Sequence, residues 1–320
     1  MAKIVECVPN FSEGRDTEKI NRIISVFDKH KEVKLINYEA DSDYNRTVVT
    51  LIGNPEKMID ALIDLTEICL DEIDLKNHSG EHPRMGAIDV IPFIPIRDIK
   101  MKECVKYSEI LALKISEKFS IPCFLYAEAA KKEDRIKLPN IRKGEYEGMK
   151  EKIKDPNWKP DYGPSNRHDT FGSLAIGVRD FLIAYNIDIE TDNEKITNRF
   201  ARAIRQSSGG FQYVQAGPVY LENRGHTQVT MNILNYKKNP IYRIFETVKM
   251  EAKRYNYNVP SAEIVGLVPK DALIRSLRYY YGVNNLEFDK EMSIKEVVEG
   301  CKKYLKLRDF EVEKIIDYFL

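Results

Sequence analysis

Cysteine is scarce in this sequence and forms no pattern. The 320 residues include five cysteines, an odd number, scattered from Cys7 to Cys301 without a C-x-x-C pair. A disulfide framework needs an even set, and a zinc knuckle needs closely spaced pairs. We therefore expect neither, and we expect the protein to work in the reducing cytoplasm.

Net charge and long apolar runs are absent as well. Lysine plus arginine and aspartate plus glutamate number 50 each, and a chain without net charge is poorly suited to nucleic acid or to an anionic membrane surface. No apolar run approaches the roughly 20 residues that span a bilayer. The strand-like stretch Ile4–Val8 starts too early to follow a signal peptide. We expect a soluble protein that binds neither nucleic acid nor membrane.

The sequence does contain enough apolar residues, 43%, to form the cores of two domains. Alternating and helical periodicities in the first half predict the order β-α-β-β-α-β, and the same order returns in the second half. Asp16 and Asn54-Pro55 are the expected starts of the first two helices. The predicted elements are 4–8, 17–29, 33–38, 46–52, 55–72 and 87–96 in the first half, and 181–189, 193–206, 212–220, 227–234, 240–254 and 263–268 in the second.

The repeated order predicts an α+β fold of two split βαββαβ, ferredoxin-like units, each a mostly antiparallel sheet covered by helices. We place the units at residues 1–177 and 178–320, with C-terminal helices after Val268 packing on the second unit. Between the repeats we expect a helix at 102–119 and a strand at 121–126. Its prolines and glycines predict that the stretch 138–172 is irregular.

One polar turn, residues 77–90, combines two of the five histidines with acids and an arginine. Its segment His78-Ser79-Gly80-Glu81-His82 matches H-x-x-E-H, in which a helix brings two histidines onto one zinc ion. Gly80 weakens a helix, and Pro83 disfavours the helical conformation at His82. A bent loop with a projecting His82 imidazole, suited to acid/base work, is favoured over the metal pair. A merely solvated turn is the alternative.

Five ordered stretches together resemble glutamate formimidoyltransferase, the formiminotransferase portion of formiminotransferase-cyclodeaminase. The resemblance extends over nearly the whole chain, and the string GEHPRMGA is its most specific part. The stretches are Val5–Gly14, Asn45–Val48, Gly80–Ala87, Ile141–Glu147 and Phe181–Asn186.

The resemblance implies transfer of a formimino group from N-formimino-L-glutamate to N5 of tetrahydrofolate, in histidine breakdown and one-carbon metabolism. His82 matches the family's catalytic histidine. The two subdomains would flank a substrate groove, and the protein would be a homodimer. Tetrahydrofolate would be a co-substrate, with no permanently bound cofactor or metal. The matching folate-binding segment is Gly163, Pro164, Ser165, Asn166, Arg167, His168, Asp169, Thr170, Phe171 and Gly172.

Because the sequence ends without a cyclodeaminase region, we expect the transfer alone, with a separate cyclodeaminase as a possible partner. The chemistry suits His82, since the attacking nitrogen must lose a proton and the departing nitrogen must gain one. A single group that titrates near neutrality can serve both steps.

Both substrates carry carboxylates, so the site needs cations. Arg46 and Arg84 are the candidates, with ion pairs to acids such as Glu39 or Asp41 as the alternative. Asn45, which precedes Arg46, and Glu39 are further candidates for substrate binding. An acid near the site could also orient the imidazole or assist proton transfer. Glu39 falls where relatives tend to have aspartate, which puts its role in doubt.

In the segment 163–172, Phe171 is the expected stacking face for the folate rings, and an interdomain linker is the alternative reading. His168 is either a pterin contact or solvent-facing. His226 is expected to be structural.

Three other functions stay open on the sequence alone. A glutamate formyltransferase would use the same site with N-formyl-glutamate. A zinc-dependent peptidase would use His78 and His82, and a non-catalytic folate-binding module would bind tetrahydrofolate without turnover.

Overall fold

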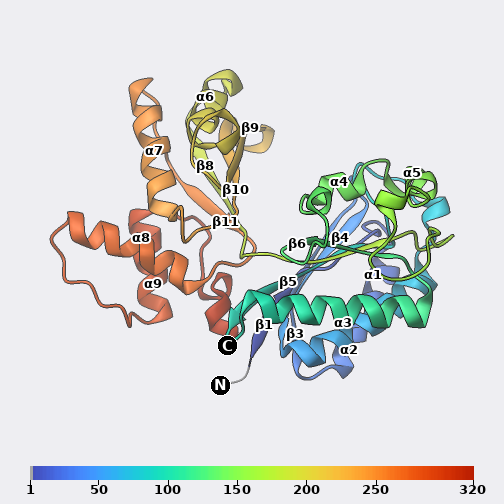
Figure 1. Cartoon of the computed structure of the whole chain (residues 1–320). Helices are drawn as coiled ribbons and strands as arrows, with labels where there is room; N and C mark the ends of the chain where they lie inside the picture. Colours follow the sequence, from blue (N-terminus) through green and yellow to red (C-terminus); the bar gives the residue numbers. More distant parts are fainter. Residues whose placement is uncertain (1–2) are drawn as a thin grey trace. The chain divides into compact units, whose positions relative to one another are not determined.

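The computed structural model describes residues 3–320, and it divides the chain into two compact units, Met1–Arg179 and Asp180–Leu320 (Figure 1). Each unit has its own sheet with helices, so the chain is α+β, as predicted. Gly177 lies inside strand β7, Leu174–Val178, so the end of the first unit follows that strand. The substrate groove between the units and the homodimer stay predictions.

The sheet of the first unit contains the four strands expected from the sequence. They are β1 with its continuation β2, then β3, β4 and β5, at Ile4–Cys7, Asn10–Phe11, Val33–Asp41, Arg46–Gly53 and Ile88–Arg97. Both β1 and β2 pair with β4 and with β5, so they act as one strand interrupted at residues 8–9. The antiparallel order β5, β1/β2, β4, β3 is that of a split βαβ unit.

Helix starts in the first unit follow the predicted caps. The Asp16 side chain accepts a hydrogen bond from the Lys19 amide at the start of α1, Thr17–Ile24. Asn54 caps α2, Pro55–Glu72, in the same way. The last turn of the first predicted helix is instead a 3-10 helix, Ser25–Lys29.

The prediction for the segment between the repeats is partly wrong. Helix α3, Met101–Phe119, and strand β6, Cys123–Ala127, form as expected. Strand β7 was not predicted, and it joins β5 and β6 in parallel. The supposedly irregular stretch 138–172 also contains two short helices, α4 (Leu138–Arg142) and α5 (Glu145–Lys152).

The first sheet is covered on both faces. Helices α2 and α3 lie on one face and α4 and α5 on the other (Figure 1). The core under α4 and α5 is the smaller of the two, and polar side chains lie beside it. Its buried members are Met85, Val90, Phe124, Tyr126, Ile141, Met149, Ile153 and Ala175.

The second unit repeats the first unit's strand order. Strands β8, β9, β10 and β11 occupy Ile183–Ile189, Val214–Leu221, His226–Ile233 and Ala262–Val265. They pair antiparallel in the order β11, β8, β10, β9. Its helices are α6, Glu194–Ile204, α7, Ile241–Arg254, α8, Lys270–Val283, and α9, Ile294–Tyr304.

After α9 the chain forms only short 3-10 helices, and Ile315 bridges to Val268 of the second unit. Across residues 3–320, none of the helices combines the length and apolarity needed to cross a bilayer.

Candidate active site

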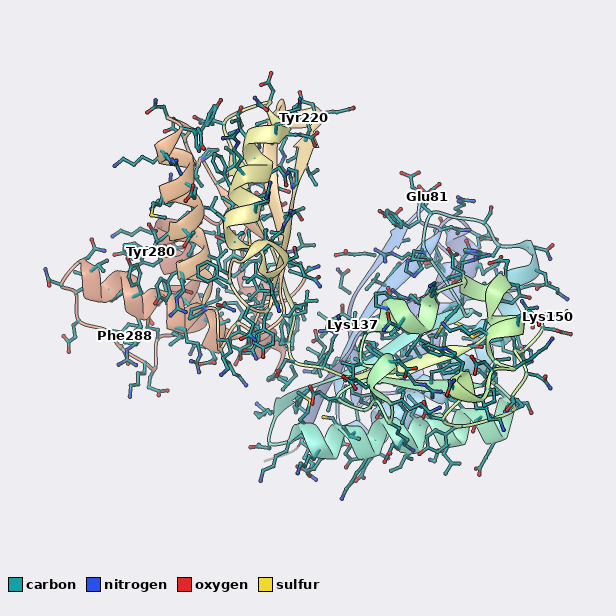
Figure 2. The ribbon with its side chains drawn as sticks, turned by 45° about the horizontal axis from the view of Figure 1, so that its top comes forward. Glu81, Lys137, Lys150, Tyr220, Tyr280 and Phe288 are labelled. Carbon is teal, nitrogen blue, oxygen red and sulfur yellow. The ribbon has the colours of Figure 1, made fainter. Side chains whose placement is uncertain are left out.

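The loop that carries His82 is bent, as predicted, and it is clamped onto the turn between β3 and β4. The amide of Glu81 donates to the Asp43 carbonyl at 3.2 Å, and the amide of His82 donates to the Tyr44 carbonyl at 3.4 Å. A Cβ at position 80 would lie 2.5 Å from the Tyr44 oxygen, so only glycine permits this approach. Glu81 itself projects outward (Figure 2) and is exposed.

The His82 imidazole does not project, contrary to the prediction, since the residue is only 4% exposed. Its Nδ1 lies 3.4 Å from Nη1 of Arg46, and its Nε2 lies 3.4 Å from Oδ2 of Asp89. The Nε2 contact lacks hydrogen-bond geometry, so this buried nitrogen has no hydrogen-bond partner among the described residues. The ring is thus held between a cation and a carboxylate.

Asp89 is the neighbour of His82 that the sequence reasoning missed. Asn10 pairs with Val90 and Phe11 with Ile88, so Asp89 is the extra residue of a β-bulge. Bulges redirect a side chain out of the strand's alternation. The fully buried carboxylate accepts from the Met85 amide at 2.9 Å and from Arg142.

Burial by itself would raise the pKa of the Asp89 carboxyl. The contact with His82 and the positive charge of Arg142 outweigh it and hold that pKa below its ordinary value. Asp89 is therefore a carboxylate beside the imidazole. An acidic residue at the edge of an apolar strand, directly after a histidine turn, is the signal that could have identified it.

His78 faces other partners than His82. Its Nε2 lies 2.9 Å from the Asn45 carbonyl, and its Nδ1 accepts from Nε of Arg84 at 3.3 Å. Burial lowers the pKa of His78, which favours the neutral ring. Because both nitrogens have protein partners, His78 holds the loop in place.

Asn45 connects three segments of the site. It adopts the left-handed conformation, with φ of 49°. Its Oδ1 accepts from the Gly14 amide at 2.9 Å, and its Nδ2 donates to the Ser79 carbonyl at 2.8 Å. Its side chain therefore links the His82 loop to the segment that contains Gly14. Glu39, by contrast, is exposed on β3 and bonds to Asn37.

The two candidate arginines differ in availability. Arg84 donates to both carboxylate oxygens of Glu147, at 2.7 and 3.0 Å, and to Glu145 at 3.0 Å. Its ion-pair partners are thus residues of α5 and not Glu39 or Asp41. Arg46 has no ion-pair partner within the described part of the chain, and its Nε is buried without a hydrogen bond. Arg46 is the cation available to a ligand.

The segment 163–172 lies within the first unit, ahead of β7, and does not link the units. Nη1 of Arg167 donates to the Tyr146 carbonyl at 2.8 Å, and its guanidinium lies 3.7 Å from the centre of the Tyr146 ring. The Tyr146 hydroxyl donates to the Asp169 carbonyl, and the Tyr146 amide donates to the Arg84 carbonyl. Tyr146 thereby ties this segment to the His82 loop.

Phe171 is fully buried in the main core, so the expectation of an exposed stacking face is wrong. Its carbonyl accepts from the Ala87 amide at 2.7 Å, which places it beside the residue that directly precedes β5. His168 is half-buried and accepts from the Phe171 amide at 3.1 Å. The exposed residues of the segment are Gly163, Ser165, Asn166 and Asp169.

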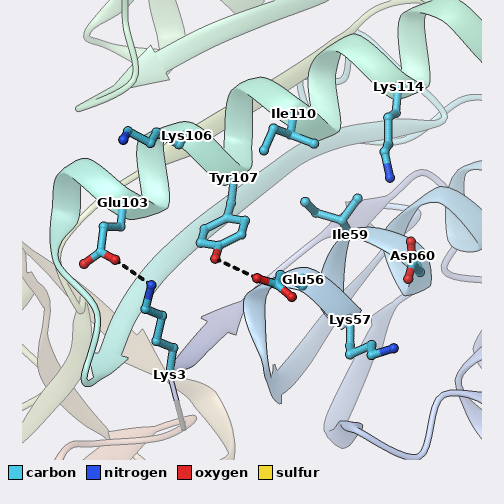
Figure 3. Close-up of a pocket in the computed structure, with 10 residues that line it drawn as sticks. All are labelled: Lys3, Glu56, Lys57, Ile59, Asp60, Glu103, Lys106, Tyr107, Ile110 and Lys114. Atoms are coloured by element: carbon cyan, nitrogen blue, oxygen red, sulfur yellow. Dashed lines mark hydrogen bonds and ion pairs between the residues drawn. The ribbon is translucent and has the colours of Figure 1, made fainter.

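A separate cavity of about 620 Å³ lies between α2 and α3 (Figure 3). Its charged lining contains both signs, and two of the lining residues, Lys3 and Glu103, form an ion pair at 2.7 Å. It contains no residue of the His82 cluster. The catalytic candidates therefore lie elsewhere, around His82, Asp89 and Arg46.

Sequence comparisons show which known proteins the chain resembles. The family model described as "Formiminotransferase domain, N-terminal subdomain" matches residues 4–179, and that of "Formiminotransferase domain" matches residues 184–320. The chain is 43% identical to a glutamate formimidoyltransferase of Streptococcus pyogenes, covering 91% of this chain and 98% of the relative. Identity to a protein of the same name from Thermoplasma acidophilum is 44%, over 89% and 94%.

A formimidoyltransferase-cyclodeaminase of Dictyostelium discoideum is 38% identical to the chain. The match covers 93% of this chain but only 57% of that longer relative.

Proposed function

The chain belongs to the formiminotransferase family, and from that membership we propose that it transfers the formimino group of N-formimino-L-glutamate to N5 of tetrahydrofolate. The products would be 5-formimino-tetrahydrofolate and L-glutamate, as in histidine degradation. The observation that carries the proposal is the buried His82 imidazole held between Asp89 and Arg46.

The neighbours of His82 favour one tautomer of its ring. A guanidinium only donates hydrogen bonds, so Nδ1, which faces Arg46, is the acceptor, and Nε2 carries the proton toward Asp89. Nδ1 is then the basic nitrogen. The Asp89 carboxylate stabilises the imidazolium that forms when Nδ1 takes up a proton.

In the proposed reaction, N5 attacks the formimino carbon and gives a tetrahedral intermediate. His82 Nδ1 takes the proton that N5 loses. The imidazolium then gives that proton to the glutamate nitrogen, the bond from this nitrogen to the formimino carbon breaks, and glutamate leaves. One residue thus acts as base and then as acid, with no net change in protonation.

Arg46 links substrate binding to this chemistry. At rest its Nη1 lies against Nδ1, where it competes for the lone pair that the base must use. A carboxylate of the glutamate donor is a stronger partner for a guanidinium than a neutral imidazole is. Binding of the donor would therefore draw Arg46 away and free Nδ1.

We propose a homodimer in the cytoplasm that uses tetrahydrofolate as co-substrate and needs no bound cofactor. The relatives named formimidoyltransferase-cyclodeaminase combine two activities in one chain. A separate cyclodeaminase would accept the product here.

The deciding experiment mixes purified protein with N-formimino-L-glutamate and tetrahydrofolate and follows 5-formimino-tetrahydrofolate spectroscopically. His82→Ala should lower kcat by about 100- to 10,000-fold, which is the usual contribution of general acid–base catalysis. His30→Ala is the control. His30 lies at the end of the 3-10 helix that follows α1, and its partner is Asp64 and not a residue of the His82 loop. Absence of product with the wild type would refute the proposed function.

Parallel assays separate the alternatives. Faster turnover of N-formyl-L-glutamate would identify a formyltransferase. Loss of activity with a chelator would indicate a zinc-dependent enzyme. Binding of tetrahydrofolate without product would indicate a non-catalytic folate-binding module.

A further inference from the structure

The carboxylate beside His82 is also held by a residue from outside the His82 loop. Oδ1 of Asp89 accepts from the Met85 amide at 2.9 Å, whereas Oδ2 has two neighbours. One is Nε2 of His82, 3.4 Å away, and the other is Arg142, whose Nη2 donates to the same oxygen. The place of this oxygen therefore depends on Arg142 as well as on the loop.

Arg142 is the last residue of α4 and lies 53 positions after Asp89 in the chain. Its side chain is 18% exposed, and its Nε is buried without a hydrogen-bond partner among the described residues. The hydrogen bond to Asp89 is what holds the guanidinium. Removing one partner of a buried ion pair leaves the other charge uncompensated, so Arg142 is needed to keep a charged Asp89 in the sheet.

The end of α4 that carries Arg142 is itself fastened by another helix. With five residues, α4 is too short to be stable alone, and its last carbonyls have no partner within the helix. Lys152, the last residue of α5, fills this role. Its Nζ donates to the carbonyls of Asn140, Ile141 and Lys143, at 2.6, 2.7 and 3.2 Å. An ammonium group has three donors, and all three are used here.

Several elements contribute the titratable and charged groups around Asp89. The His82 loop contributes the imidazole, and β4 contributes Arg46 on the far side of that ring. Strand β6 contributes Tyr126, and burial raises the pKa of its phenol to about 12, so it is neutral near physiological pH. Arg142 is thus the permanent positive charge in direct contact with Asp89.

We propose that Arg142 is a positioning residue for the transfer reaction, because it holds the Asp89 carboxylate beside His82, and that Lys152 fixes the α4 end from which Arg142 extends. This rests on the proposed function, in which Asp89 stabilises the imidazolium of His82. Arg142 and Lys152 act through their neighbours and not on the reacting atoms.

Two variants of Arg142 separate its charge from its packing. Arg142→Met should lower kcat by about 10- to 100-fold with little change in KM, which is the usual effect of losing a hydrogen bond to a charged group. The pKa of the Asp89 carboxyl should rise, because fewer contacts then oppose the effect of its burial. The acid side of the pH profile of kcat/KM should therefore move to higher pH by about one unit or more. Arg142→Lys keeps the charge and should recover most of kcat and the wild-type profile.

A double-mutant cycle tests whether Arg142 acts through Asp89. In the Asp89→Asn background there is no carboxylate to hold, so Arg142→Met should cause little further loss of kcat. A residue that merely supports the fold would lower kcat by the same factor in both backgrounds.

A second cycle tests the contribution of Lys152. Lys152→Met should lower kcat by a smaller factor than Arg142→Met and should add little to it in the double variant. Lys150→Met is the matched control, since Lys150 lies on the same helix and is exposed (Figure 2). Melting curves establish that each variant is folded.

A folded Arg142→Met with an unshifted pH profile, or with equal losses of kcat in both backgrounds, would overturn this inference. The proposed function would still stand in that case if the wild type made 5-formimino-tetrahydrofolate.

Urea titrations followed by the fluorescence of Trp158 give a parallel test that needs no turnover. The loss of folding free energy caused by Arg142→Met should grow as the pH rises from the acid range toward neutrality, because wild-type Asp89 ionises at lower pH. It should not change with pH in the Asp89→Asn background. This result with an inactive wild type would keep Arg142 in its role at Asp89 and overturn only the proposed function.

Discussion

Glu6 carries a carboxyl group into the centre of the first sheet, and replacing it should change how stability depends on pH. The residue is 4% exposed and pairs with Ile52 on one side and Ile94 on the other, both of them buried. This apolar burial raises the pKa of Glu6 to about 7, although the charge of Arg179 opposes the rise. We expect Glu6→Gln to remove the loss of folding stability that ionisation of this buried carboxyl causes as pH rises.

The direction in which stability changes with pH follows from proton binding. Between the ordinary glutamate pKa of 4.5 and the folded-state pKa of about 7, the folded protein holds a proton that the unfolded chain has released. Wild-type stability therefore falls as pH rises through this window and levels off above it. Between about pH 5 and about pH 8 the loss amounts to about 2.5 kcal/mol, since each unit of pKa shift is worth about 1.4 kcal/mol.

The chain contains a single tryptophan, Trp158, which lies in the first unit and packs against Arg135 and Lys152. Its fluorescence reports unfolding of the unit that contains Glu6. Urea titrations of wild type and Glu6→Gln across the pH range give the difference in free energy of unfolding, in which titrations common to both proteins cancel. Glu18→Gln, at an exposed position of α1, is the control.

The difference between Glu6→Gln and wild type should grow with pH in favour of the variant. A constant difference across the range would refute the reasoning, because it would mean that Glu6 titrates alike in the folded and unfolded chains.

Three further outcomes are expected. Asp89→Asn should lower kcat by about 100-fold or more with little change in KM, because the imidazolium loses its stabilising charge. A lower kcat/KM that comes only from a higher KM, with kcat unchanged, would contradict this. Arg135→Met should destabilise the first unit by about 3–5 kcal/mol, because it leaves the buried Asp161 carboxylate without its 2.7 Å ion-pair partner. Lys154→Met, which removes an exposed ion pair, should have no measurable effect in the same urea titration. Gly80→Ala should reduce activity, because the added Cβ displaces the His82 loop from Tyr44, and a fully active variant would argue against this close contact. Gly148→Ala is the comparison in α5, where the added Cβ meets nothing within 4 Å, and it should stabilise the protein by about 0.5–1 kcal/mol.

The sequence predicted the repeated element order because each unit's signals are local. Asp16 and Asn54-Pro55 mark helix starts through side chains a few residues from the backbone they cap. Strand β7 has no such signal, since its five apolar residues form a strand only by pairing with β5 and β6. Helices α4 and α5 are likewise short, and Gly144 between them has a φ of 94°.

The sequence pointed to His82 and to its neighbours Asn45 and Arg46, but it did not point to Asp89. His82 stood out through its unusual turn, but its burial depends on Arg46 and Asp89, which are 36 and 7 positions away in the chain. Asp89 reaches it only because of a bulge, which arises from strand pairing. The ion-pair partners of Arg84, Glu145 and Glu147, were not foreseen because they lie in a helix that was not predicted.

The hydrogen bonds of Tyr146 have a thermodynamic consequence. Tyr146 contacts Arg84 through its amide, and Arg167 and Asp169 through its carbonyl and hydroxyl, so one residue orders both the His82 loop and the segment 163–172. A ligand that rigidifies either segment lowers the entropy cost of ordering the other. By linkage the benefit is mutual, and each substrate should raise the affinity for the other by the same factor. Donor and acceptor are then expected to bind synergistically, in either order.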